Sequence, residues 1–162
     1  MKLHAPAPIG PGHRVAEFQS GRAAIDEWLQ GAEPMRRDDR AGTFVVAGED
    51  GRVAAFYTLA SASVRGAVAT GVPPIPVMKL GRIAVDRTLQ GRGTGTALVL
   101  DAIARCNVVA EHTPVAALIT DAPDTKSAAW MTRLGFRPVP GRAMTLVMSR
   151  DTIAALCRIG RG

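Results

Sequence analysis

Apolar positions along the chain follow two different periods, which predicts a mixed α/β protein. Runs rich in β-branched and aromatic residues predict strands over 43–48, 53–62, 77–85, 115–120 and 143–148. Val99, Ala102, Ile103 and Cys106 share one face of a predicted helix over 94–110. Other helices are expected over 33–39, 125–133 and 151–158, and between a Ser20 cap and Gly31. With no repeat or linker between these elements, the sequence predicts one domain over residues 1–162.

A glycine-rich segment, Gln90-Gly91-Arg92-Gly93-Thr94-Gly95, joins the predicted central strand to the 94–110 helix. Its glycines tolerate positive φ and keep side chains away from the backbone. The first amides of the helix lack intrahelical partners and lie at the positive end of the helix dipole, so the turn is predicted to bind a pyrophosphate. A P-loop is excluded, because Thr96-Ala97 stands where Lys-Ser or Lys-Thr is required. A dinucleotide fold would place the glycines after its first strand.

With the preceding Leu-Gly-Arg-Ile-Ala-Val-Asp, this turn resembles the acetyl-CoA signature of the GNAT N-acetyltransferase superfamily. Segments 18–29 and 74–82 are similar to the TacT/AtaT-like toxin branch, which belongs to type II toxin–antitoxin systems. The resemblance implies an α/β GNAT fold: a mixed, mostly antiparallel sheet with splayed central strands, flanked by helices. It implies acetyl-CoA as co-substrate and no metal. The implied cofactor-binding residues are Ile83, Ala84 and Val85 for pantetheine, and Gln90, Gly91, Arg92, Gly93, Thr94, Gly95 and Thr96 for the pyrophosphate.

The toxin branch acetylates the amino group of aminoacyl-tRNA and so blocks translation. The resemblance therefore implies a cytoplasmic toxin with aminoacyl-tRNA as substrate, a ribbon-helix-helix antitoxin as partner, and a homodimeric state. Two alternatives stay open at this point. One is an acetyltransferase for a small amine or a peptide N-terminus, and the other is an acetyl-CoA-binding protein with weak activity.

The second alternative arises from one departure from the family pattern. The proton donor of the branch is usually the tyrosine of a Phe-Tyr-x-x-x-Gly-Phe motif, and the matching segment here places Met131 at the tyrosine position. A thioether has no proton to donate. Three possibilities follow. The enzyme works through positioning, oxyanion stabilisation and water, without a side-chain acid. Alternatively, the hydroxyl of Tyr57 or Thr132 replaces that of the tyrosine, or the transfer activity is weak or absent.

The composition of the chain is basic, which bears on its partner. The net charge of +6 and pI near 10.3 suit a polyanion. Two groups of arginines are candidates for tRNA phosphate contacts: the mixed-sign run 36–40, and Arg133, Arg137 and Arg142.

Other chemistry finds little support in the sequence. No apolar stretch reaches 18 residues, so we expect no membrane span. His4, His13 and His112 are isolated, and Cys106 and Cys157 fit no metal spacing. No Gly-x-Ser-x-Gly elbow is present. Asp121 and Asp124 are predicted to cap the next helix rather than to catalyse, and Glu111-His112 is predicted to lie in a loop.

Overall fold

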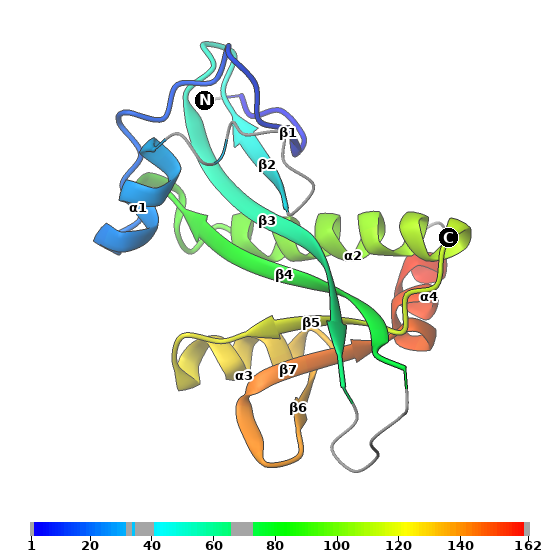
Figure 1. Ribbon diagram of the computed structural model, residues 1–162. Coiled ribbons are helices and arrows are strands. Elements are labelled where there is room, and N and C mark those ends of the chain that lie inside the picture. The colour runs from blue at the N-terminus through cyan, green and yellow to red at the C-terminus, as the bar shows by residue number, and fades with distance from the viewer. Residues whose placement is uncertain (1, 32–33, 35–40, 66–72, 161–162) are drawn as a thin grey trace. The chain divides into compact units, whose positions relative to one another are not determined.

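The computed structural model describes residues 2–31, 34, 41–65 and 73–160 (Figure 1). Within these residues, seven strands form a sheet in the order β1-β2-β3-β4-β5-β7-β6. Strands β4 and β5 pair in parallel, whereas β1 with β2, β2 with β3, β5 with β7 and β6 with β7 pair antiparallel, which confirms the mixed sheet. The predicted helix over 33–39, the arginine run 36–40 and most of the loop after β3 lie outside the described residues.

The chain divides into two compact units, each built from two segments. The first contains Met1–Leu59 and Gly81–Asp101, and the second contains Ala60–Leu80 and Ala102–Gly162. Strands β3 (Val53–Val64) and β4 (Ile75–Val85) and helix α2 (Thr94–His112) contribute residues to both.

The first unit places strands β1 (Ala7–Pro8) and β2 (Gly42–Ala47) beside the first half of β3. Helix α1 (Ala23–Gln30) is the only α-helix drawn before β2 among the described residues (Figure 1). It contributes Leu29 to the buried cluster of this unit, and Ile25 and Trp28 pack against that cluster. The buried cluster consists of Phe18, Leu29, Val45, Val53, Phe56 and Ala84. This cluster fixes the end of β4, because Ala84 is part of it.

Neighbouring residues of β3 show which helix covers which face. Phe56 packs in the α1 cluster, whereas the Tyr57 hydroxyl donates a hydrogen bond to Asp101 of α2. Successive side chains of a strand point to opposite faces of its sheet. Within this unit, α1 and the first turns of α2 therefore cover opposite faces.

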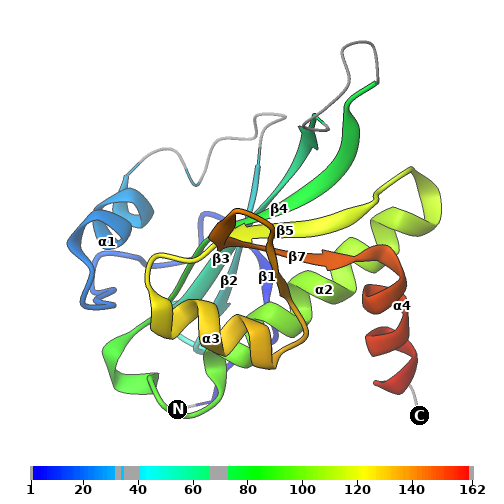
Figure 2. The ribbon, with the colours of Figure 1, turned by 90° about the horizontal axis from the view of Figure 1, so that it is seen from below.

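The second unit contains β5 (Ala117–Asp121), β6 (Arg137–Val139) and β7 (Arg142–Ser149) with helices α3 (Thr125–Arg133) and α4 (Arg150–Ile159). Both helices pack on β7 (Figure 2). The β4–β5 ladder pairs Met78–Leu80 with Leu118–Thr120 and ends there, although β4 continues to Val85. The last residues of β4 therefore have no β5 partner in this ladder.

Several sequence predictions need correction. The N-cap of α1 is Arg22 and not Ser20, whose hydroxyl instead donates to Asp26 at 2.6 Å. Glu111 and His112 continue α2 rather than forming a loop. Asp124 caps α3 as predicted, by accepting from the Ser127 amide at 2.7 Å, but Asp121 pairs with Lys79 at 3.1 Å. Strands β1 and β6 and the 3-10 turn Arg87–Leu89 were not predicted.

None of the helices in the described ranges has the length and apolarity needed to cross a membrane.

Candidate functional site

The glycine-rich turn has the backbone that a phosphate cradle requires. Gly91 and Gly93 adopt φ of 79° and 81°, in the left-handed region that L side chains rarely occupy. A Cβ added at either glycine would meet no atom within 4 Å, so packing does not require glycine there. The first helical bond of α2 runs from the Ala97 amide to the Gly93 carbonyl at 3.0 Å. The amides of Thr94 and Gly95, which precede this bond, have no acceptor within the helix. A phosphate group fits this open helix start.

Gln90 braces this turn with its side chain. Its amide nitrogen donates to the Val85 carbonyl at 2.9 Å and to the Ser20 carbonyl at 2.7 Å. The side chain thus joins the end of β4 to the segment that enters α1. Gln90 was predicted as part of the cofactor-binding turn, and the structure adds this positioning role.

Strand β4 presents its backbone edge at Ile83 and Val85. The Asp86 amide donates to the Ala54 carbonyl of β3 at 2.8 Å, so by alternation Ile83 and Val85 direct their amides and carbonyls away from β3. The Ile83 carbonyl accepts from the Arg22 guanidinium at 2.9 Å, and the Val85 carbonyl accepts from Gln90. A carbonyl has two lone pairs and can accept a second bond. The edge therefore keeps donors and acceptors for an amide-containing arm.

Asp86 fixes the approach to the turn from inside the fold. It is 4% exposed and accepts hydrogen bonds from the Gln19 amide at 3.0 Å and from the amide and hydroxyl of Thr88 at 3.1 Å and 2.8 Å. Burial acts to raise the pKa of this carboxyl, but the hydrogen bonds from Gln19 and Thr88 outweigh it and hold the pKa below its ordinary value. Asp86 thus stays ionised at neutral pH and ties residues 19 and 88 to the strand end.

Met131, at the position of the family tyrosine, belongs to the second unit. It is 3% exposed on α3, and its carbonyl accepts the amides of Leu134 and Phe136 at the end of the helix. Thr132, one of the two replacement candidates, is exposed and donates its hydroxyl to the Ala128 carbonyl at 2.8 Å. A hydroxyl that bonds its own helix in this way has a structural use for its proton.

Tyr57, the other replacement candidate, is fully buried in the first unit. Its ring stacks on Phe44 at 5.2 Å between centroids, and its hydroxyl donates to Asp101. A buried hydroxyl that donates to a carboxylate is positioned to join β3 to α2. This environment favours a structural role for Tyr57 over that of a proton donor.

Replacing Tyr57 with phenylalanine is the corresponding test. We expect the free energy of unfolding to fall by about 1–2 kcal/mol, because one buried hydrogen bond is lost. Acetyl transfer and CoA affinity should stay within about twofold of the wild type, because the packing of the ring is unchanged. Denaturant unfolding and steady-state kinetics measure the two effects. A folded variant with transfer reduced a hundredfold or more would restore Tyr57 as the acid.

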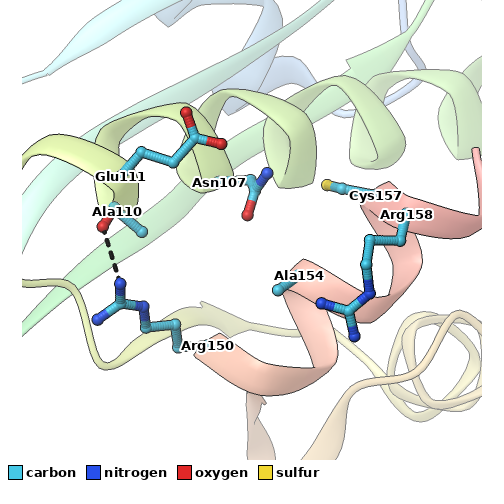
Figure 3. A pocket seen from close by; sticks show the side chains of 7 residues that line it. All are labelled: Asn107, Ala110, Glu111, Arg150, Ala154, Cys157 and Arg158. Carbon is cyan, nitrogen blue, oxygen red and sulfur yellow. Dashed lines mark hydrogen bonds between the residues drawn. The ribbon is translucent and has the colours of Figure 1, made fainter. Parts of the chain in front are cut away.

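A pocket of the second unit lies between α2 and α4 (Figure 3). Its lining residues are Asn107, Ala110, Glu111, Arg150, Ala154, Cys157 and Arg158. Arg150 donates to the Ala110 carbonyl at 3.2 Å on one side of it. None of the residues predicted to bind acetyl-CoA lines this pocket.

Metal and thiol chemistry remain unsupported in the described part of the chain. No group of three His, Cys, Asp or Glu residues there could hold a metal ion. Burial, together with the neighbouring Cys157, raises the pKa of the Cys106 thiol to about 11. Cys106 is therefore protonated at neutral pH, which disfavours thiolate chemistry.

Three residues of this site could not be inferred from sequence. Arg22, Asp86 and Gln19 meet the turn and the strand edge across gaps of more than 60 residues. Asp86 alone carries a local signal, since an acidic residue directly after a buried strand is a common cap of the following turn.

Comparisons with known proteins agree with this geometry. Residues 13–136 match the acetyltransferase (GNAT) family. The chain is similar to a tRNA-acetylating toxin of Mycobacterium tuberculosis, with 34% identity over 94% of this chain and 95% of that protein. It is 24% identical to a probable toxin TacT of Sinorhizobium fredii, over 92% of each. The structure of AtaT complexed with acetyl-methionyl-tRNAfMet superimposes with a TM-score of 0.84 at 24% identity, over 96% of this chain and 99% of that one. The chain therefore belongs to the GNAT acetyltransferase family, in the branch of toxins that its sequence motifs indicated.

Proposed function

We propose that this protein is a toxin that acetylates the amino group of aminoacyl-tRNA with acetyl-CoA and so inhibits translation. The glycine turn with two positive-φ residues before α2 is the observation that supports the co-substrate. The acceptor follows from the 34% identity to the tRNA-acetylating toxin over nearly the whole chain. AtaT shares the fold, and a crystal structure of AtaTR bound with AcCoA is known.

Backbone groups of this chain supply much of the mechanism. The bound co-substrate contributes an acetyl thioester. The amides at the start of α2 would hold its pyrophosphate, and the Ile83 and Val85 edge would align the arm that carries the thioester. An amide on this edge can stabilise the oxyanion that develops when a neutral amine attacks. Alignment of two bound reactants alone can contribute several kcal/mol, on the order of 7–11 in well-oriented cases.

The proton for the departing thiolate has no side-chain donor at position 131. We infer that water supplies it, because Met131 has no proton, Thr132 donates to its own helix and Tyr57 is buried. The alternative is an acetyl-CoA-binding protein with weak transfer, and Met131 is the observation that favours it. The third possibility, acetylation of a small amine or peptide N-terminus, gains no specific contact from the described residues.

Replacing Met131 with tyrosine separates a missing acid from an acid that is not needed. If protonation limits the rate, Met131→Tyr should raise kcat by about tenfold or more, within the range of general acid catalysis. Met131→Phe is the matched control, because it adds the same ring without the hydroxyl. Single-turnover kinetics with both variants measure the difference. Equal rates for the two variants would mean that the enzyme uses no acid at this position.

We also propose the partners that the branch suggests. AtaT has been solved with the C-terminus of its antitoxin AtaR, and this chain would pair with a ribbon-helix-helix antitoxin and form a homodimer in the cytoplasm. Arg133, Arg137 and Arg142 are exposed at the end of α3 and on β6 and β7, where they could contact tRNA phosphates. The arginine run 36–40 lies outside the described residues.

The test of the function is incubation of the purified protein with radiolabelled acetyl-CoA and total charged tRNA. We expect label on the RNA that mild alkaline deacylation removes, since it would reside on the esterified amino acid. Label that stays on the RNA, or none at all while calorimetry shows acetyl-CoA binding, would reject the aminoacyl-tRNA assignment in favour of a small-amine enzyme or a binding protein.

A further inference from the structure

Arg82 of β4 places its guanidinium over the indole ring of Trp28. The Cζ atom lies 4.1 Å from the ring centroid, within the range of a cation–π contact. Trp28 in turn stacks on Phe56 at 5.8 Å with an interplanar angle of 15°, and Phe56 packs edge-on against Phe18. Because Phe56 and Phe18 are buried in the cluster under α1, the indole is a fixed support for the guanidinium that lies over it.

The backbone of Arg82 is fixed as well. Its amide donates to the Thr58 hydroxyl at 2.9 Å, and that hydroxyl lies close enough to Gly81 to exclude a side chain there. Both ends of the Arg82 side chain are therefore positioned. A guanidinium with its orientation already set loses less entropy when it forms a bidentate contact.

The guanidinium nevertheless lacks an anionic partner among the residues that the structure describes. Arg82 is exposed; its backbone amide donates to the Thr58 hydroxyl and its guanidinium lies over the Trp28 ring. The ring covers one face of the guanidinium and leaves its N–H donors at the edge. Those donors match the oxygens of a phosphate in spacing and charge.

The position of Arg82 separates it from the phosphates of CoA. It shares a strand face with Ala84, which packs under α1, whereas the glycine turn leads into α2 on the other face. Arg82 also lies four residues, or about 13 Å of strand, before Asp86, which precedes the turn. It adjoins Ile83, on whose backbone edge the thioester arm is expected to lie. A ligand phosphate at Arg82 would therefore belong to the acceptor.

We propose that Arg82, oriented by Trp28, binds a backbone phosphate at the single-stranded 3′ end of the acceptor tRNA. The inference rests on the proposed function, since it assigns a contact to that substrate. Arg82 positions the tRNA end so that its aminoacyl group reaches the Ile83 edge. It takes no proton and stabilises no reacting atom.

The experiment compares wild type with Arg82→Ala, Arg82→Lys and Arg158→Ala. Arg158→Ala removes the same charge from α4, in the second unit. Filter binding of charged tRNA to the CoA-bound proteins over a range of salt concentrations gives the affinity and the number of phosphates contacted. Transfer to charged tRNA and to an aminoacyl-adenosine without phosphates gives KM and kcat. Transfer by the wild type tests the proposed function by itself, and the comparison of variants tests the role of Arg82.

We expect Arg82→Ala to weaken tRNA binding and raise KM for charged tRNA by about tenfold at low salt, with kcat little changed. The slope of log K against log salt should become shallower by about 0.7, the value for one phosphate of a single strand. Arg82→Lys should keep the slope but lose part of the affinity, because an ammonium cannot form the bidentate contact. Turnover of aminoacyl-adenosine and CoA affinity should match the wild type.

Two results would overturn the inference. One is a salt slope and KM for Arg82→Ala equal to those of Arg158→Ala. The other is an equal loss with aminoacyl-adenosine, which would mean that Arg82 only supports the packing of α1 on β4. Wild-type protein that binds tRNA with the Arg82-dependent slope but transfers no label would instead reject the proposed function and retain the contact.

Discussion

Replacing Gly93 with valine is expected to abolish CoA binding, with an affinity loss of about 100-fold or more, equivalent to about 2.7 kcal/mol. Gly93 has φ of 81°, and a β-branched residue in that region is strained by about 1–3 kcal/mol. The turn would relax toward negative φ and redirect the amides that precede α2. Since a Cβ at this position meets no atom within 4 Å, the fold itself should persist. Calorimetry with CoA measures the loss.

The matched control for Gly93→Val is Gly141→Val. Gly141 has φ of 79° and the same open surroundings, but it lies in the turn between β6 and β7. The two variants thus carry the same backbone strain, and only one carries it in the predicted phosphate turn. CoA affinity should be retained in Gly141→Val. Equal, wild-type affinities in two folded variants would contradict the assignment of the phosphate turn.

Local patterns accounted for most of the elements and for the turn. The glycine segment was predictable because its spacing, the preceding strand and the following helix are continuous in sequence over residues 77–110. Strands β2, β3, β4, β5 and β7 were found within a few residues of their ends, because each carries a run of apolar residues. Strands β1 and β6 were missed, because two or three residues that include a proline cannot show a period.

Side-chain contacts that no local pattern shows account for what could not be predicted. Ser20 has the chemistry of an N-cap, yet Asp26 accepts its hydroxyl and amide, and the helix begins two residues later. Arg22 and Arg82 are ordinary exposed arginines in the sequence. Their roles depend on the packing of α1 against β4, which brings Arg22 to the Ile83 carbonyl and Trp28 to Arg82. The cofactor-binding and catalytic residues assigned from the family stay predictions until the variants are measured.

Removal of the Asp86 carboxylate should produce the largest loss of stability. Asp86→Ala leaves the Gln19 amide and both Thr88 donors without their acceptor, inside the fold. We expect the free energy of unfolding to fall by about 3 kcal/mol, since hydrogen bonds to a buried charge are lost together. CoA binding should weaken as well, because Asp86 anchors the residues that lead into the turn. Asp151→Asn, at an exposed position in the first turn of α4, is the control and should change stability by less than about 0.5 kcal/mol.

The pH dependence of stability distinguishes the contribution of the Asp86 charge from the contribution of the shape of its side chain. Hydrogen bonds hold the folded-state pKa of Asp86 below its ordinary value of 3.8, despite the opposing effect of burial. The ionised carboxylate therefore stabilises the fold at every pH above that ordinary value, and the contribution is lost as the pH falls through the lower folded-state pKa. The stability difference between wild type and Asp86→Asn should be constant from pH 7 down to about pH 4 and should shrink below it. Denaturant unfolding at several pH values measures this difference. A gap that stays constant to pH 2 would mean that Asp86 acts through its shape alone, and a gap that closes near pH 6 would mean that its pKa is raised rather than lowered.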